Sequence, residues 1–278
     1  MRVPRMDEGL LAELTAPYDL FDRMLSVAGL HPAGVEEPYY DEMLLRIDED
    51  RLETPAGSTT SSLATYCSAS ASMLDGFALH RDEPVTALFD IGEVQDWLAW
   101  VDDGGPVTVR VFGDPETGNA GELALSAGGL EAHVDCYRDP EMLAEVTLEL
   151  PNRFTDEERF ILEDGELAPT VVETRAEELA RIADGVELDR ATTTYPFVVR
   201  DSALRVELGD TRYTRATGTL DGAVTGPDVR NEYDRGFSLV FDTVRGPVTV
   251  QTGPDEPLVV VSDREAFTLR YVLLPIVW

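Results

Sequence analysis

The sequence contains no lysine, so all 22 of its basic residues are arginine, against 54 acidic residues and a formal net charge of −32. The acidic residues are spread along the chain among apolar ones, which differs from the pattern of a disordered acidic tail. Such a charge destabilises a compact state by self-repulsion, but at about 1 M salt the screening length falls to about 3 Å. The composition predicts adaptation to very high salt. Binding to a basic partner is the alternative interpretation.

Cysteine and histidine are also scarce, and their spacing predicts neither a metal site nor a disulfide framework. The run His133-Val134-Asp135-Cys136 combines three reactive residue types. In a strand, however, Cys136 points away from His133 and Asp135, which argues against a cysteine nucleophile. Gly104-Gly105-Pro106 follows a helical pattern where a phosphate-binding loop would precede one. We therefore predict a protein that is not an enzyme and has no cofactor and no metal.

Long apolar runs are missing as well, since no stretch approaches the roughly 18–20 residues of a membrane span. The first five residues, Met1-Arg2-Val3-Pro4-Arg5, lack the apolar core of a secretion signal. These features lead us to expect a cytoplasmic protein. With 278 residues and 43% hydrophobic content, the chain can form one large domain or two of about 140 residues.

A five-residue sequence occurs twice, as Gly105-Pro106-Val107-Thr108-Val109 and as Gly246-Pro247-Val248-Thr249-Val250. A Phe-Asp step precedes each copy, and two β-rich runs follow each. The surrounding order of expected elements repeats too. The chain therefore reads as two versions of one module.

Both modules are predicted to contain many short strands and two helices. In the first we expect helices after Thr15 and over residues 91–101, and strands over residues 10–14, 43–47, 51–54, 63–69, 85–89, 107–112, 122–126 and 130–137. In the second we expect a helix opened by Thr174 and Glu177, a short helix or turn over 240–244, and strands over residues 170–172, 196–200, 204–208, 213–219, 237–239, 247–252, 258–261 and 267–274. This order predicts an antiparallel α+β fold. We expect Trp97 and Trp100 to lie in the core.

The pattern loosens between the modules, where Asp139-Pro140, Leu150-Pro151 and an acidic run interrupt it. We therefore predict an N-terminal domain over residues 1–137, an interdomain linker over 138–168 and a C-terminal domain over 169–278. Within the linker, residues 152–166 read as an inserted loop.

Three stretches, in this order along the chain, resemble one known family. Tyr271-Val272-Leu273-Leu274-Pro275-Ile276-Val277 is similar to the C-terminal ending of sliding clamps of the proliferating cell nuclear antigen (PCNA) type. Residues 170–172, followed by 179–184, resemble the strand and helix that open the second domain of these clamps. Residues 130–137, followed by Asp139-Pro140, resemble the end of their first domain. The resemblance covers nearly the whole chain from Leu10 onward.

The resemblance implies a two-domain clamp fold that assembles as a homotrimeric ring around double-stranded DNA, without sequence preference. Such rings are DNA polymerase processivity factors, and their partners are DNA polymerase, other replication proteins that carry peptide motifs, and a clamp loader. The implied DNA-binding residues are Arg23, Arg175, Arg181, Arg235 and Arg245. The implied partner-peptide residues are Val146, Leu148, Leu150, Leu274, Pro275 and Val277. The implied subunit interface comprises Leu130, His133, Val134, Cys136, Tyr213, Arg215 and Thr217.

The chain departs from the family in three places: a longer linker, a short second helix in the second module, and no basic residue on the helix over 91–101. These departures suggest a divergent clamp, for example from a virus or other mobile replicon. Two alternatives remain open. One is a clamp-like paralogue acting as a monomeric adaptor or inhibitor, and the other is a halophilic hydrolase with an unrecognised site.

Overall fold

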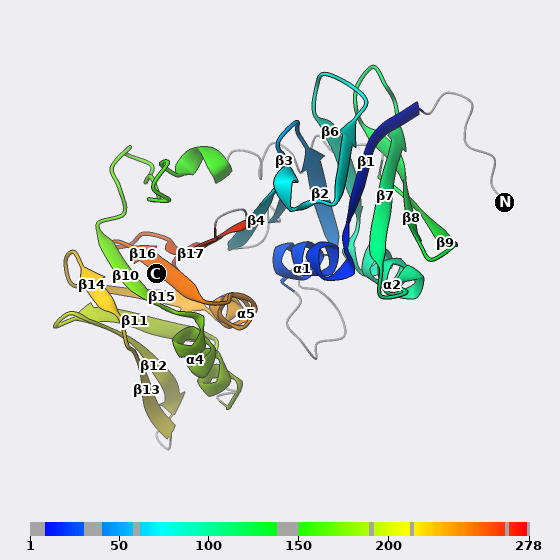
Figure 1. Ribbon diagram of the computed structural model, residues 1–278. Coiled ribbons are helices and arrows are strands. Elements are labelled where there is room, and N and C mark those ends of the chain that lie inside the picture. Colours follow the sequence, from blue (N-terminus) through cyan, green and yellow to red (C-terminus); the bar gives the residue numbers. More distant parts are fainter. Residues whose placement is uncertain are drawn as a thin grey trace. The chain divides into compact units, whose positions relative to one another are not determined.

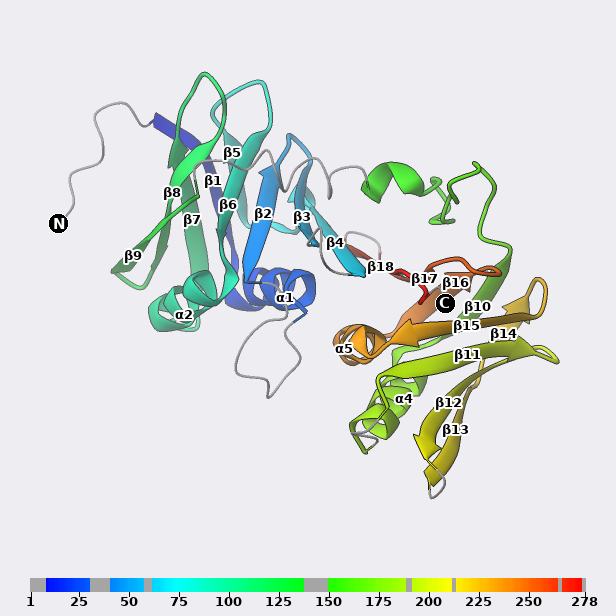
Figure 2. The same ribbon diagram turned by 180° about the vertical axis from the view of Figure 1, so that it is seen from behind.

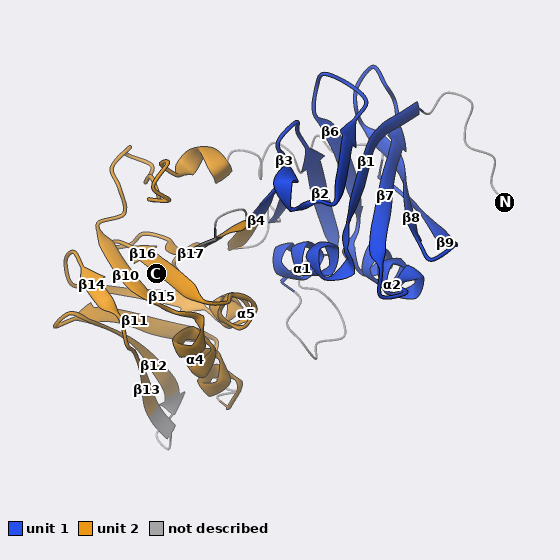
Figure 3. Cartoon of the chain, viewed as in Figure 1, with its two compact units in different colours: residues 1–57, 66–147 blue, residues 58–65, 148–278 orange. Residues whose placement is uncertain are grey.

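The computed structural model describes residues 9–30, 41–57, 62–137, 150–188, 192–211, 214–264 and 267–276. The chain divides into two compact units (Figure 3). Unit 1 comprises residues 1–57 and 66–147, and unit 2 comprises residues 58–65 and 148–278. The second half of the predicted linker thus belongs to unit 2, as do eight residues of the predicted N-terminal domain. The first half of the predicted linker, residues 138–149, lies outside the described residues.

Unit 1 contains two antiparallel sheets and two helices (Figure 1). The first sheet has the order β5-β1-β7-β8-β9, from strands Gly76–Leu79, Gly9–Pro17, Pro106–Gly113, Ala120–Ala127 and Leu130–Asp135. The second contains the order β4-β3-β2-β6, from strands Leu63–Ser70, Arg51–Gly57, Glu42–Ile47 and Val85–Asp90, of which the first three residues of β4 belong to unit 2. A short 3-10 helix, Ala71–Met73, follows β4.

The two helices of unit 1 pack against each other and begin where the sequence favours it. Helix α1, Tyr18–Ala28, starts directly after Pro17, whose fixed φ suits the start of a helix, and Gly29 ends it. Helix α2, Ile91–Val101, is capped by Asp90, whose carboxylate accepts the Glu93 N–H at 2.7 Å. Each helix turns an apolar stripe towards the sheets.

Unit 2 repeats this plan, as the view from behind shows (Figure 2). Its first sheet contains the order β14-β10-β16-β17-β18, from strands Ala223–Thr225, Thr170–Arg175, Pro247–Thr252, Leu258–Arg264 and Phe267–Leu273. Its second has the order β13-β12-β11-β15, from strands Thr214–Leu220, Ala203–Thr211, Thr194–Arg200 and Val229–Asp234. Helices α4, Ala176–Leu188, and α5, Gly236–Thr243, pack against each other.

The five-residue repeat occupies equivalent strands. In unit 1, β7 pairs with β1 so that Pro106 lies opposite Pro17, the last residue before α1. In unit 2, β16 pairs with β10 so that Pro247 lies opposite Arg175, the last residue before α4. The predicted α+β fold of two similar antiparallel domains is therefore confirmed.

Three expectations about local structure are wrong. Thr174 does not cap helix α4, because it lies within β10 and its hydroxyl donates to the Asp221 carbonyl at 2.7 Å. Residues 237–239 belong to helix α5, because Phe237, Val240 and Phe241 recur at helical spacing and bury one face. Phe237 packs edge-to-face against Tyr195, Phe197 and Phe241, which makes the helical arrangement the one that buries all of these rings. The expected core positions Trp97 and Trp100 are exposed. The sequence pattern also missed strands β5, β14 and β15.

Candidate binding surfaces

Residues 150–168, here called the cover segment, fold onto one face of strands β17 and β18. The segment opens with a 3-10 helix, Leu150–Arg153, and buries Phe154, Phe160 and Leu162. These side chains pack on Val259, Val261 and Val272 of the two strands, and Leu150 lies partly buried beside them. The rings of Phe154 and Phe160 meet edge-to-face at 5.3 Å.

This packing explains why apolar and polar residues do not alternate along Leu258-Val259-Val260-Val261. In register, Val259 lies opposite Val272, whereas Val260 lies opposite Tyr271, whose hydroxyl contacts Thr243 of α5. Successive side chains of a strand point to opposite faces. Both faces of β17 are therefore covered, one by the cover segment and one by the α5 side.

Polar contacts hold the cover segment in one position. The Arg270 guanidinium binds both carboxylate oxygens of Glu158 at 2.6 Å and lies 4.7 Å from the centre of the Phe154 ring. The fully buried Gln251 side chain accepts the Phe160 N–H at 2.9 Å and donates to the Glu158 carbonyl at 2.6 Å. A bidentate pair and a satisfied buried amide specify a single geometry.

Leu274 of the C-terminal run lies beside residues that unit 2 takes from an earlier part of the chain. The Leu274 N–H donates to the Ser62 carbonyl at 2.7 Å, and the Ser62 hydroxyl donates to Asp234. Leu274 is 52% exposed, and Pro275 is half-buried. Of the predicted peptide-binding residues, Leu150, Leu274 and Pro275 are therefore placed, all in unit 2. Val146, Leu148 and Val277 lie outside the described residues.

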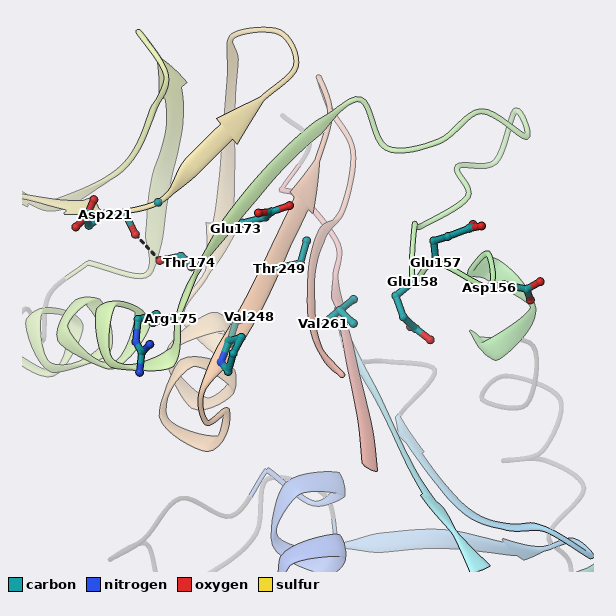
Figure 4. A pocket seen from close by; sticks show the side chains of 12 residues that line it. Asp156, Glu157, Glu158, Glu173, Thr174, Arg175, Asp221, Val248, Thr249 and Val261 are labelled. Carbon is teal, nitrogen blue, oxygen red and sulfur yellow. Dashed lines mark hydrogen bonds between the residues drawn. The ribbon is translucent and has the colours of Figure 1, made fainter. Parts of the chain in front are cut away.

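A groove of about 650 Å³ runs between the cover segment and the exposed face of β10 and β16 (Figure 4). The sequence patterns did not predict it, because its walls come from three separate parts of unit 2. Glu173, Thr249 and Val261 line it from the sheet, and a turn at Asp221-Gly222 and the acidic run of the cover segment also line it. A Cβ at Gly222 would lie 2.3 Å from the Glu173 carbonyl, so this turn requires glycine.

The lining of the groove is mostly anionic. It carries Asp156, Glu157, Glu158, Glu173 and Asp221 against one cation, Arg175. Glu158 is paired with Arg270, and Arg175 with Glu177 at 3.2 Å. The lining therefore favours cationic over anionic ligands.

The predicted DNA-binding arginines divide between the helices and the segments that flank them. Arg23 lies half-buried in α1, and Arg181 projects from α4 with a side chain 73% exposed. Arg175 ends β10, Arg235 precedes α5 and Arg245 follows it. Arg235 donates to the Val186 carbonyl at 3.2 Å, and Arg245 to the Val244 carbonyl at 2.8 Å, so local contacts orient both side chains.

The predicted interface strands are sheet edges. Among the described residues, β9 pairs only with β8, and β13 only with β12. On β9, Val134 is buried in unit 1, and His133 and Leu130 are exposed; Cys136 is buried directly after the strand. On β13, Thr217 is exposed and Arg215 lies within the strand. Tyr213 lies outside the described residues.

The described part of the chain contains no group of three or more His, Cys, Asp or Glu residues arranged to hold a metal ion. Burial raises the pKa of the Cys67 thiol to about 12, which keeps it protonated near neutral pH. No described helix is long and apolar enough to cross a bilayer.

Comparison with known proteins gives matches to solved structures only. No protein-family model and no curated protein matches the sequence. Among solved structures, the Proliferating Cellular Nuclear Antigen of Entamoeba histolytica is similar with a TM-score of 0.72 and 10% identity, over 97% of this chain and 100% of that one. A. fulgidus PCNA, in a structure with the C-terminal region of FEN-1 bound, is similar with a TM-score of 0.71 and 14% identity, over 96% and 99%. The chain therefore has the two-domain α+β fold of the PCNA clamps.

Proposed function

We propose that this protein is a homotrimeric DNA sliding clamp that encircles duplex DNA and tethers DNA polymerase and other replication proteins to it. The observation that carries the proposal is the match to PCNA structures along nearly the whole chain. The internal repeat supports it, because units 1 and 2 share one sheet order and one placement of helices. We take units 1 and 2 as the two domains of the proposed clamp.

The two sheet edges support ring formation. An unpaired edge strand invites pairing with another chain, and a closed ring removes both edges at once. We assign the subunit contact to β9 of one copy and β13 of the next, with Leu130, His133, Arg215 and Thr217 among its residues. Val134 contributes its backbone, because its side chain is buried in unit 1.

Encirclement also suits the charge of this protein. Phosphate contacts made by arginine weaken steeply as salt rises, because binding depends on release of counterions. A closed ring is retained on DNA by topology and needs little electrostatic affinity. Arg23, Arg175, Arg181, Arg235 and Arg245 are then sufficient as dispersed contacts in a protein of net charge −32.

Partner peptides are assigned to the region where the cover segment begins and the C-terminal run ends. The A. fulgidus clamp is seen with the C-terminal region of FEN-1 bound, which supports peptide recognition by this fold. Here Leu274 presents an exposed apolar side chain, and Pro275 follows it. Apolar residues exposed on so acidic a surface favour a binding role.

Light scattering coupled to size exclusion at multimolar salt tests the ring. We expect a particle of three times 30.6 kDa, and a ring in electron micrographs. DNA threading is checked by retention on closed circular duplex and release after linearisation. A stable monomer at every concentration would refute the clamp proposal and favour the monomeric adaptor.

A fluorescent peptide from a polymerase tail tests the partner site. Leu148→Ala and Pro275→Ala should each weaken binding about tenfold, because each removes an apolar anchor. Met73→Ala is the matched control, since Met73 is an exposed apolar residue of unit 1, whereas the proposed site is built from residues of unit 2. Unchanged affinity in both test variants would reject this site and leave the ring proposal standing.

A further inference from the structure

Hydrogen bonds within the cover segment join its successive turns. The Ile161 N–H donates to the Arg153 carbonyl at 2.7 Å, and the Ala168 N–H donates to the Phe160 carbonyl at 2.9 Å. The Arg153 side chain also donates to the Ile161 carbonyl at 2.9 Å. A contact that fixes one residue of the segment therefore positions the others, because the turns between them are already closed.

Gln251 of β16 is one side chain that attaches the segment to the sheet. It lies opposite Val259, which lies opposite Val272, so its amide stands in one cross-strand row with two valines of the covered cluster. The amide accepts the Phe160 N–H and donates to the Glu158 carbonyl, and it is fully buried. A polar side chain in an apolar layer thus supplies directional bonds that packing alone does not.

Arg270 of β18 is a second attachment. Its guanidinium holds both carboxylate oxygens of Glu158 at 2.6 Å, and the two side chains are 14% and 21% exposed. Salt screens such a shielded pair much less than an exposed one, so the pair still acts at high ionic strength. Together with Gln251, it fixes Glu158 through both its side chain and its carbonyl.

These attachments lie next to the proposed partner site. Alternation along β18 places Arg270 and Val272 on the covered face, and Leu274, two residues further along the chain, is 52% exposed. Leu150 packs, partly buried, on the apolar cluster that includes Val272. The site thus has a cover half at Leu150 and a tail half at Leu274 and Pro275, and both halves adjoin the covered end of β18.

The tail half is fixed by backbone contacts of its own. The Leu274 N–H donates to the Ser62 carbonyl at 2.7 Å, and the Ile276 N–H donates to the Glu232 carbonyl at 2.8 Å. The cover half moves with the cover segment. The distance between the two halves therefore depends on what holds that segment to the sheet.

We propose that Gln251 and Arg270 are positioning residues for partner binding, which hold the cover half in place relative to the tail half before a peptide arrives. The inference rests on the partner site proposed above. Apolar burial is non-directional, so packing of the cover segment alone permits more than one placement on the sheet. Two bonds from Gln251 and a bidentate pair from Arg270 select a single placement. Both residues act through the cover segment and without touching the peptide.

Positioning residues and contact residues affect different rate constants. A site that is assembled for only part of the time binds with an apparent Kd raised by the inverse of the assembled fraction. Loss of a positioning residue therefore lowers kon, because fewer encounters meet an assembled site. Loss of a contact residue raises koff, because the bound peptide is held less tightly.

Stopped-flow binding of the fluorescent polymerase-tail peptide at multimolar salt measures both rate constants. Arg270→Gln and Gln251→Met should each lower kon about tenfold and change koff less than about twofold. Leu148→Ala, the contact variant, should act mainly on koff. Arg110→Gln, which removes a half-exposed arginine from unit 1, should alter neither rate constant.

A rescue experiment and a stability control separate positioning from general destabilisation. Arg270→Glu alone sets two carboxylates against each other and should lower kon most. The exchange Arg270→Glu/Glu158→Arg rebuilds the pair with reversed charges and should return kon to within about threefold of wild type. Phe241→Leu, in the aromatic core of unit 2, should lower the melting temperature and leave kon unchanged.

Hydrogen exchange shows whether each variant still folds. Amides of β11 and β12, in the other sheet of unit 2, should keep their protection, whereas the Phe160 amide should lose it in Arg270→Gln and in Gln251→Met.

Each failure is distinct. A wild-type protein that does not bind the peptide refutes the partner site, and this inference with it. Binding by wild type with an unchanged kon in both variants refutes the inference and leaves the partner site standing. A loss of affinity through koff alone shows that Gln251 and Arg270 act as contacts, which overturns their positioning role. An equal fall of kon in Phe241→Leu traces the effect to general stability and also overturns it.

Discussion

Units 1 and 2 share one plan of nine described strands but enclose their first sheets differently. In unit 1, the outer face of β7, β8 and β9 carries charged side chains, among them Arg110, Glu122 and His133. In unit 2, the equivalent strands β16, β17 and β18 carry Gln251, Val261 and Val272, buried beneath the cover segment. The same module thus has a second apolar layer in unit 2 and a solvated face in unit 1.

The largest expected difference is in the free energy of unfolding after loss of an arginine: Arg270 beneath the cover segment of unit 2, or Arg110 on the solvated face of unit 1. Arg270→Gln should lower the free energy of unfolding by about 2–3 kcal/mol, because it breaks a well-shielded bidentate pair and the contact with Phe154. Arg110→Gln, the matched change in unit 1, should cost about 0.2–1 kcal/mol, since Arg110 and Glu13 are 37% and 40% exposed. Urea denaturation at constant high salt measures both.

Equal losses in the two variants would contradict the comparison. Hydrogen exchange adds a local readout: in Arg270→Gln, protection of the Phe160 amide should fall, while that of β8 should not change.

An effect of intermediate size is expected from the aspartates that precede helix α2 of unit 1 and helix α5 of unit 2. Asp90→Ala should cost about 1 kcal/mol, because it leaves the Glu93 N–H of α2 without its cap. Asp234→Ala should cost more, because Asp234 accepts both the Gly236 N–H at 2.7 Å and the Ser62 hydroxyl. Urea unfolding of the two variants ranks them. The reverse order would contradict the larger role assigned to Asp234.

The smallest effect belongs to His133 on the solvated face of unit 1. Hydrogen bonding to Glu122 raises the pKa of His133 and the Glu131 carboxylate adds to this, while partial burial opposes it. Because the folded pKa exceeds the unfolded one, near 6.5, the stabilisation is complete below that pH and is lost as pH rises through the folded pKa.

Solvent screening keeps the contribution of His133 below about 0.5 kcal/mol, because its side chain is half exposed. Arg110, which also contacts Glu131 at 3.7 Å, competes for that carboxylate. The difference in stability between wild type and His133→Gln, measured from pH 5.5 to 8.5, should therefore shrink towards high pH. A difference that grows towards high pH would contradict the assignment.

The sequence alone predicted most elements because their signals are local. Asp90 with Glu93 marked the start of α2, and the apolar spacing that follows marked its length. The Gly-Pro step at Gly105 and again at Gly246 located equivalent strands, since glycine ends a helix and proline can begin a strand. These signals depend on neighbouring residues only, so they can be read without the fold.

Tertiary structure decided the rest, because burial depends on partners distant in the chain. Phe237 looked strand-like until the rings of Tyr195 and Phe197 gave it a helical packing site. The cover segment looked like a linker until Val259 and Val272 supplied a face for Phe154 and Phe160. Trp97 and Trp100 looked like core residues because their spacing is helical, and spacing does not tell which flank of a helix meets a neighbour. The composition determined the charge, the local patterns determined the elements, and only the fold determined which apolar side chains remain exposed.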